Sequence, residues 1–303
     1  MKVVVLHNPR SGKGRGAAAA SELDVRLRER GHDAVAISTG QEAELETALA
    51  GAGALIVVGG DGTLHRSLGA CERSRVPVYH YATGNQNLLA RECGHRADAG
   101  RAIAAIEAGR TRAMDLGVLA SLADLSTSRR FALMASMGPD AAVIERLSRS
   151  RGKAAGHFVY LMPVLEEAWD AMRHPRPPVL RVWVDGKKVA DDAGWLVISN
   201  CRSFALGMDP GAACAGGVDP SDGLLDLAFF PLRSRLGVLT WMARCRLGTA
   251  GAHPAFVGVR GSEIVVEGKS PWQADGEAGQ PPTDGQKLRF ECRKGALSVF
   301  CSD

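Results

Sequence analysis

The first sixty residues alternate between short β-branched runs and longer helical segments, and this order limits the fold more than any other feature. The runs 2–7 (KVVVLH), 33–39 (DAVAIST) and 54–60 (ALIVVGG) are typical of buried strands. Residues 17–31 and 41–53, which lie between these runs, have helical periodicity. A strand–helix–strand–helix–strand order predicts an open, mostly parallel sheet with helices on its faces.

Residues 64–109 continue this α/β pattern, but after about residue 112 strand-like runs follow one another at hairpin spacing. These runs cover 111–120, 129–138, 178–190, 193–201, 224–231, 262–268 and 288–295, and helical segments at 141–149, 157–172 and 235–248 interrupt them. We therefore predict an α/β domain over residues 1–115. A mostly antiparallel β-sandwich domain follows over residues 116–303, and its last few residues can pack back on the first domain.

Composition excludes some classes of protein. The chain has 37 basic and 33 acidic residues, and a net charge of +4 is too small to indicate a nucleic-acid binder. The seven cysteines are scattered, so we interpret them as reduced thiols of a cytosolic protein. No apolar run of about 18 residues could span a bilayer, and the apolar run at the N-terminus is too short for a signal peptide.

Two glycine-rich loops each lie between a predicted strand and a predicted helix. The loop at 7–16 (HNPRSGKGRG) and the loop at 59–63 (GGDGT) can both turn backbone amides toward an anion. In an open parallel sheet, ligands bind at the carboxyl ends of the strands, where both loops would lie. The alternatives are a flexible turn for the first loop and a tight turn with a capping Asp61 for the second.

Three further stretches carry candidate residues. Residues 84–93 (GNQNLLAREC) contain Asn87, which could be only an N-cap. Residues 217–230 (GVDPSDGLLDLAFF) contain clustered carboxylates that suit Mg²⁺ or form only an acidic turn. Residues 272–279 (WQADGEAG) contain a hairpin turn signal that does not require the following glutamate.

Together, NPRSG, GGDGT, NLLAREC, DPSDGLLD and DGE resemble, in this order, the diacylglycerol kinase catalytic-domain family of lipid kinases. That family also includes sphingosine and ceramide kinases and many small bacterial lipid kinases. NAD kinases share GGDGT, but the leading NPRSG and the trailing DGLLD and DGE favour the lipid kinases. The resemblance covers essentially the whole chain and implies a fold of the NAD kinase and diacylglycerol kinase type.

The resemblance implies a nucleotide-binding first domain and a lipid-substrate second domain, with ATP in the cleft between them. The residues implied to bind ATP are Asn8, Pro9, Arg10, Ser11, Gly12, Thr39, Gly59, Gly60, Asp61, Gly62, Thr63, Asn85 and Asn87. The implied Mg²⁺ ligands are Asp219, Asp222 and the Leu224 carbonyl. Glu277 matches the family's general base, with Asp275 beside it and Asp61 facing the same reaction centre.

Two loops depart from the family pattern. The family has Pro-x-Gly-Thr before its Asn, whereas residues 81–87 here read YATGNQN, so that Asn85 occupies the threonine position. The glycine-rich run of the second domain is here FALGM, residues 204–208, and keeps only Gly207. These changes leave the lipid, the nucleotide preference and the level of activity open.

The leading expectation is an ATP- and Mg²⁺-dependent lipid kinase that is cytoplasmic, peripheral to the membrane and without a transmembrane segment. Its partner would be a lipid at the membrane surface and not a nucleic acid, and an exposed β-domain edge makes a homodimer natural. Two alternatives remain: a kinase of a soluble substrate such as NAD, and a nucleotide-binding regulatory protein with weakened catalysis.

Overall fold

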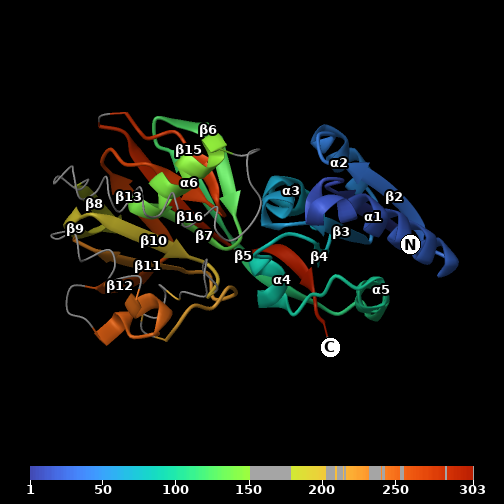
Figure 1. The fold of residues 1–303 in the computed structure, drawn as a ribbon. Helices are drawn as coiled ribbons and strands as arrows, with labels where there is room; N and C mark the ends of the chain where they lie inside the picture. The colour runs from blue at the N-terminus through green and yellow to red at the C-terminus, as the bar shows by residue number, and fades with distance from the viewer. Residues whose placement is uncertain are drawn as a thin grey trace. The chain divides into compact units, whose positions relative to one another are not determined.

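The computed structural model describes residues 1–150, 179–202, 209, 214, 216–231, 240, 243–252, 256–283 and 285–302. The chain divides into two compact units, one of residues 1–116 with 294–303 and the other of residues 117–293 (Figure 1). Two strands, β5 (Thr111–Ser121) and β16 (Lys287–Phe300), contain residues of both units.

The first unit contains a parallel sheet in the order β2–β1–β3–β4. Its strands are β1 (Lys2–His7), β2 (Asp33–Ser38), β3 (Ala54–Gly59) and β4 (Val78–Ala82). Every residue of β3 is buried, as expected for a central parallel strand that is covered on both faces. The predicted open parallel sheet is confirmed.

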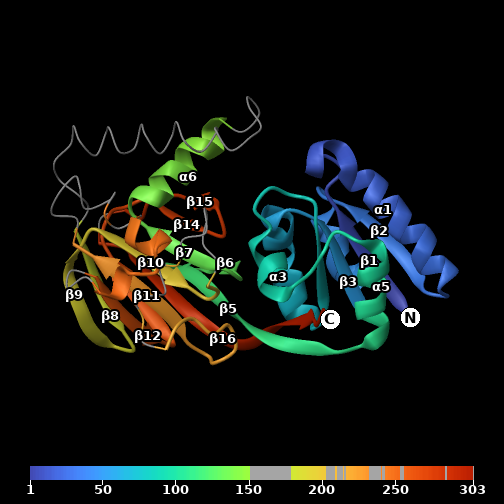
Figure 2. The same cartoon turned by 60° about the horizontal axis from the view of Figure 1, so that its bottom comes forward.

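Helices follow the strands of this unit in turn and cover both faces of the sheet. They are α1 (Ser11–Glu29), α2 (Glu42–Leu49), α3 (Asp61–Ser74), α4 (Leu88–Cys93) and α5 (Ala99–Ala108). Figure 2 shows α3 on one side of the strands and α1 and α5 on the other. On the side of α1 and α5, the core joins Leu23 and Leu27 of α1 and Ile103 of α5 to Val5 and Ile56 of the sheet.

The end of β16 completes the first unit. Val299 pairs in parallel with Val78 of β4, and Phe300 belongs to the buried core of this unit. The buried ring of His95 links the two strands, because its Nδ1 accepts from the His80 amide and its Nε2 donates to the Phe300 carbonyl at 2.8 Å. His95 is therefore the Nε2–H tautomer, and burial lowers the pKa of its ring to about 4.

The second unit contains two sheets. One is antiparallel in the order β12–β11–β10–β7–β14–β15. In the other, β13 pairs antiparallel with β16 and β8, β8 pairs with β9, and β5 pairs with β6 and β16. The further strands are β6 (Asp124–Phe131), β7 (Met134–Met137), β8 (Leu180–Val184), β9 (Lys187–Ala193), β10 (Trp195–Ser199), β11 (Leu225–Phe230), β12 (Val257–Gly261), β13 (Glu263–Glu267), β14 (Trp272–Ala274) and β15 (Glu277–Gly279).

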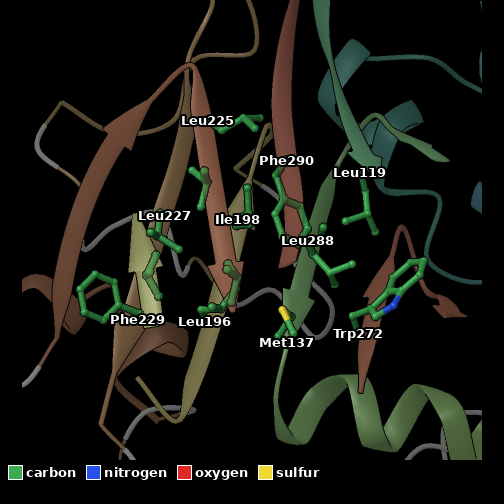
Figure 3. Close-up of a cluster of buried hydrophobic side chains, with 14 of the residues drawn as sticks. Leu119, Met137, Leu196, Ile198, Leu225, Leu227, Phe229, Trp272, Leu288 and Phe290 are labelled. Carbon is green, nitrogen blue, oxygen red and sulfur yellow. The ribbon is translucent and has the colours of Figure 1, made fainter. Parts of the chain in front are cut away.

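Apolar side chains from both sheets meet in one core, which makes this unit a sandwich (Figure 3). Leu196 and Leu227 of the first sheet and Leu288 and Phe290 of the second belong to the same buried cluster. Helix α6 (Pro139–Ser150) packs against β14 and β15, and a short 3-10 helix covers Ala250–Ala252. The predicted β-sandwich class is confirmed.

Some predicted elements differ from the structure. The strand expected over residues 129–138 is two strands, because the chain breaks between Phe131 and Met134. Strand β12 was not expected, since its run is short and contains glycines. Strands β14 and β15 flank the hairpin turn signal at 272–279, although the sequence analysis gave them no bounds. The helix expected over 157–172, the FALGM loop and half of the residues of the helix expected over 235–248 lie outside the described residues.

All seven cysteines are free thiols, as the sequence predicts. Within the part of the chain that the structure describes, we find no helix with both the length and the apolar character to cross a bilayer.

Candidate active site

The loops that follow the parallel strands of the first unit lie at one edge of its sheet. Hydrogen bonds continue from the strands into these loops, because the Thr39 amide donates to the His7 carbonyl at 2.8 Å and the Thr83 amide donates to the Gly59 carbonyl at 2.9 Å. The structure therefore brings together the predicted residues of the loops after β1, β2, β3 and β4. This is the edge at which open α/β sheets bind ligands.

The loop after β1 is held by its own side chains. Asn8 Oδ1 accepts from the Arg10 amide at 3.0 Å, and the Asn8 carbonyl accepts from the Ser11 hydroxyl at 2.8 Å. Thr83 Oγ1 donates to Ser11 Oγ at 2.8 Å, which ties this loop to the loop after β4. Pro9 is half-buried and Arg10 is exposed, as are the other two charged residues of this loop, Lys13 and Arg15.

Close backbone packing explains Gly16 of this loop. A Cβ atom on Gly16 would lie 2.0 Å from the Asn8 carbonyl oxygen, so only glycine fits there. Gly12, Lys13 and Gly14 have positive φ and are not helical, although they lie within the bounds of α1. The regular part of α1 thus begins after a turn whose backbone is exposed or half-buried. The sequence did not reveal that the packing of this turn requires glycine at position 16.

The GGDGT loop joins β3 to α3 by a tight turn. Gly60 is the extended residue before α3, and its carbonyl accepts from the Thr63 amide at 2.9 Å. Thr63 is buried, and a Cβ atom on Gly59 would lie 2.4 Å from its hydroxyl. Gly60 and Gly62 are half-buried, and the Gly62 amide lies in the first turn of α3, where an anion is favoured.

Asp61 occupies the first turn of α3. Its Oδ1 accepts from the Leu89 amide at a long 3.4 Å, and a negative charge is favourable at a helix N-terminus. Directly below this turn, the buried His80 donates from Nε2 to the Gly59 carbonyl at 3.2 Å. Burial lowers the pKa of His80 and the charge of Asp61 opposes this, so His80 is a neutral support of the loop that the sequence did not indicate.

The loop after β4 packs against the GGDGT loop through glycine. A Cβ atom on Gly84 would lie 2.6 Å from Gly60 Cα and 2.8 Å from Asn87 Oδ1. Asn87 has the position of an N-cap, with φ at 52°, but its side chain makes no cap hydrogen bond; instead its Nδ2 donates to the Gly84 carbonyl at 2.8 Å. Asn85 is exposed.

The side-chain oxygen of Asn87, Oδ1, suggests that a ligand binds here. Asn87 Oδ1 is closed to solvent and has no hydrogen-bond partner among the described residues. A buried acceptor without a donor is unfavourable by about 1–3 kcal/mol, and an amino or hydroxyl group of a nucleotide could supply the donor. The residues at this edge therefore fit ATP.

The DGE sequence of the second unit forms the turn between β14 and β15. Asp275 and Gly276 both have positive φ, as a two-residue hairpin turn of type I′ requires. The Asp275 carboxylate accepts from the backbone amides of Ala132, Leu133 and Met134 at 2.8, 2.9 and 3.0 Å. These bonds stabilise the segment that joins β6 to β7. Asp275 therefore has a structural role, whether or not it also takes part in catalysis.

Glu277 is the first residue of β15 and pairs with Ala274 across the hairpin. The residue is half-buried, and its backbone is fixed by the hairpin. A carboxylate with this combination can accept a proton from a substrate hydroxyl. The predicted role of Glu277 as general base is compatible with this placement and stays a prediction.

The acidic loop before β11 contains the predicted magnesium ligands. Asp219 Oδ1 accepts from the Ser221 hydroxyl at 2.7 Å and from the Ser221 amide at 3.0 Å, and these bonds lower the pKa of Asp219. Asp222 Oδ1 accepts from the Leu224 amide at 2.9 Å. Oxygen donors of this kind are those that Mg²⁺ prefers.

An arginine that the sequence did not single out shares this loop. Arg260 of β12 pairs with Asp222 through Nη2 and donates from Nε to Asp226 at 2.8 Å. Among the described residues, no group of three or more His, Cys, Asp or Glu side chains is arranged for a metal. The oxygen atoms of this loop therefore fit Mg²⁺ only as a small set of ligands, with water completing the coordination. One carboxylate oxygen of Asp222 is already bonded to Arg260.

Two family models match the chain. The diacylglycerol kinase catalytic domain matches residues 2–119, and the C-terminal domain described as YegS-type and NAD kinase β-sandwich-like matches residues 134–301. The second match alone spans more than half of the chain. The chain belongs to the diacylglycerol kinase family of lipid kinases.

Two relatives with lipid-kinase names are similar to this chain over much of its length. A "Diacylglycerol kinase" of Mycobacterium tuberculosis is 31% identical over 191 residues, 62% of this chain, and the match spans 58% of that protein. A "Probable lipid kinase YegS-like" of Pseudomonas aeruginosa is 27% identical over 82% of this chain and 76% of that protein.

At the level of fold, the chain is similar to a diacylglycerol kinase of Bacillus anthracis, with a TM-score of 0.67 at 14% identity over 99% of this chain and 97% of that one. It is also similar to yeast NADH kinase solved with NADH, with a TM-score of 0.58 at 12% identity over 100% of this chain and 83% of that one.

Proposed function

We propose that this protein is an ATP-dependent kinase that transfers the γ-phosphoryl group to a lipid hydroxyl, with diacylglycerol or a related lipid as acceptor. The observation that carries the proposal is the convergence of the NPRSG, GGDGT and YATGNQN loops at one sheet edge of a lipid-kinase family member. These loops offer backbone amides, hydroxyls and the buried Oδ1 of Asn87, which has no hydrogen-bond partner among the described residues.

In this proposal, the glycines of the two strand–helix loops let their amides approach the phosphates, and Ser11 and Thr63 supply hydroxyls. Thr39 and Asn85 would contact the nucleotide from the neighbouring loops. The phosphates are thereby oriented by backbone that is already fixed by hydrogen bonds. Positioning and charge neutralisation account for most of phosphoryl-transfer catalysis.

Glu277 would accept the proton of the lipid hydroxyl as its oxygen forms a bond to the γ-phosphorus, while the bond to the leaving ADP breaks. Asp61 lies among the phosphate-binding amides and would face the same reaction. Asp219, Asp222 and the Leu224 carbonyl would hold Mg²⁺, which supplies positive charge when bound.

The test is phosphorylation of lipids in mixed micelles. Purified protein, radiolabelled ATP and Mg²⁺ are incubated with diacylglycerol, ceramide or sphingosine, and labelled phospholipid is expected from at least one of them. Label on NAD without detergent would instead identify a soluble substrate. Nucleotide binding with no transfer to any acceptor would favour the regulatory alternative.

A lipid acceptor also requires the protein to visit a membrane from the water side. We therefore propose a cytoplasmic protein peripheral to the membrane, and pairing of two copies through a β-domain edge stays part of this proposal. Co-sedimentation with vesicles checks the membrane contact, and sedimentation velocity checks the pairing of two copies. A protein that stays in the supernatant at every lipid concentration would contradict the peripheral membrane contact.

A further inference from the structure

A continuous chain of hydrogen bonds runs from α6 to the turn that precedes Glu277. The Gly276 amide donates to Gln273 Oε1 at 2.8 Å, and Gln273 Nε2 donates to Ser136 Oγ at 2.9 Å. The Ser136 hydroxyl in turn donates to Oδ2 of Asp140, in the first turn of α6. Three side chains thus connect the start of a helix to the backbone next to the proposed general base.

The middle of this chain is buried. Ser136 of β7 and Gln273 of β14 are directly paired residues of adjacent strands, and their exposed fractions are 0% and 3%. Buried polar groups are unfavourable unless they are hydrogen-bonded, so neither side chain can exchange its partner for water. The geometry of this hydrogen-bond chain is therefore determined by the protein and not by solvent.

The chemistry of the end group sets the direction of every bond. An ionised carboxylate only accepts hydrogen bonds, so the Ser136 hydroxyl must point its proton at Asp140. The lone pairs of Ser136 Oγ are then left for the amide nitrogen of Gln273. This orientation places the Gln273 carbonyl oxygen toward the Gly276 amide, and polarised chains of this kind strengthen each bond.

The opposite orientation would fail at the turn. The Gln273 side chain also makes a hydrogen bond to Asp140 itself. Without Asp140 to orient the Ser136 proton and the Gln273 amide, this amide could turn over and present its NH₂ group to the Gly276 N–H, donor against donor. The Asp275 carboxylate, on the Ala132–Met134 amides, holds the other side of the same turn. Glu277 thus follows a turn that both the Gln273 side chain and the Asp275 carboxylate hold, and of these two contacts only the one through Gln273 leads to α6.

We propose that Asp140 is a positioning residue that, through Ser136 and Gln273, fixes the turn carrying Glu277 in its catalytically competent geometry. This inference rests on the proposed function, because it assigns a purpose to the placement of Glu277. Asp140 itself contacts neither substrate nor nucleotide in this scheme. Its position in the first turn of α6 favours a negative charge there.

The experiment uses Asp140→Asn and Ser136→Ala in the full chain, with Asp191→Asn as the matched control. Asp191 is an exposed carboxylate of β9 in the same unit and pairs with Lys188. Hydrogen exchange of the Gly276 amide is measured by NMR, and kcat and KM for ATP are measured with the lipid acceptor. Ser136→Thr keeps the hydroxyl and serves as the rescue variant.

We expect faster exchange at Gly276 and a kcat lower by roughly 10-fold in Asp140→Asn and Ser136→Ala, with KM for ATP unchanged. Asp191→Asn and Ser136→Thr should resemble the wild type in both measurements. A general loss of stability would instead accelerate exchange throughout the second unit.

Unchanged exchange at Gly276 in Asp140→Asn overturns the inference, whether or not the protein is a kinase. Faster exchange with wild-type kcat also overturns it, provided that Glu277→Gln is inactive in the same assay. If the wild type phosphorylates no lipid, the proposed function fails, and the exchange at Gly276 alone decides whether Asp140 holds the turn.

Discussion

The Nε atom of Arg260 donates a hydrogen bond of 2.8 Å to Oδ1 of Asp226, the residue directly opposite it on the neighbouring strand. Asp226 is fully buried, and its Oδ2 has no hydrogen-bond partner among the described residues. Burial raises the pKa of Asp226 and the Arg260 guanidinium opposes this shift. The arginine therefore compensates a carboxylate in the interior of the sandwich.

Replacing Arg260 by methionine should destabilise the protein by about 3 kcal/mol, because an uncompensated charge or a protonated acid would remain buried. Urea unfolding measures the effect. The matched control is Arg181→Met, which removes an exposed pair with Glu267 and should change the free energy of unfolding by less than about 1 kcal/mol. Equal losses in the two variants would contradict the role assigned to Arg260.

The loss of Asp222 should weaken magnesium binding. Asp222→Asn removes a charged oxygen from the proposed ligand set, so the dissociation constant for Mg²⁺ should rise by at least about 10-fold. Titration calorimetry on the nucleotide-free protein measures binding without reference to activity, and Asp191→Asn is the control. A wild type that binds no Mg²⁺, or an Asp222→Asn variant that binds it equally well, would exclude this loop as the metal site.

The general base is tested by Glu277→Gln, which keeps the size of the side chain and removes its proton affinity. Lipid phosphorylation should fall by about 100-fold or more in kcat, while ATP binding stays near the wild-type value. Glu263→Gln, at a half-exposed position on β13 paired with Arg289, is the control and should remain active. A fully active Glu277→Gln would remove this residue from the mechanism.

The contact between Gly84 and Gly60 makes a prediction about nucleotide binding. The Cβ atom of Gly84→Ala would lie 2.6 Å from Gly60 Cα, so one of the two loops must move. We expect the dissociation constant for ATP, measured by calorimetry, to rise by roughly 10-fold or more, since the phosphate-binding amides are displaced.

Gly100→Ala is the matched control for this change. Gly100 lies within α5, where an added methyl group meets only Asp98 Oδ1, at 3.3 Å, and alanine is the better helix former. Its ATP affinity should be unchanged. An unaffected Gly84→Ala variant would show that the close packing of the two loops is irrelevant to the nucleotide.

The sequence was sufficient for the features that depend on local pattern. Apolar, β-branched runs predicted strands β1, β2 and β3, and the DGE sequence predicted the turn at Asp275 and Gly276. Each of these signals lies within a few residues, because strand burial and turn geometry are decided locally.

The contacts between distant residues could not be predicted. Arg260 lies 34 residues from Asp226, and Gln273 lies 137 residues from Ser136. Only strand register makes each pair neighbours. The Asp275 carboxylate binds backbone amides, which leave no mark in the sequence of their residues. A single sequence therefore indicates which residues carry chemistry, but not which buried groups hold them in place.

Stability should respond to pH through Asp140. Burial raises the pKa of its carboxyl to about 6, above the usual value near 4, so the folded protein binds this proton more tightly than the unfolded chain does. The stabilisation from the protonated acid is complete below about pH 4 and is lost as the pH rises through about 6. The Asp140→Asn variant lacks this titrating group. The other carboxylates titrate in both proteins, so their contribution cancels when the two proteins are compared.

The free energy of unfolding of the wild type minus that of Asp140→Asn should therefore decrease between about pH 4 and pH 6 and be constant from pH 7 to pH 8. Urea unfolding of both proteins across this range measures the difference, with Asp191→Asn as a control whose difference stays flat. A difference that grew with pH would mean that the folded protein favours the ionised form. Asp140 would then be a stabilising anion, with its pKa lowered and not raised.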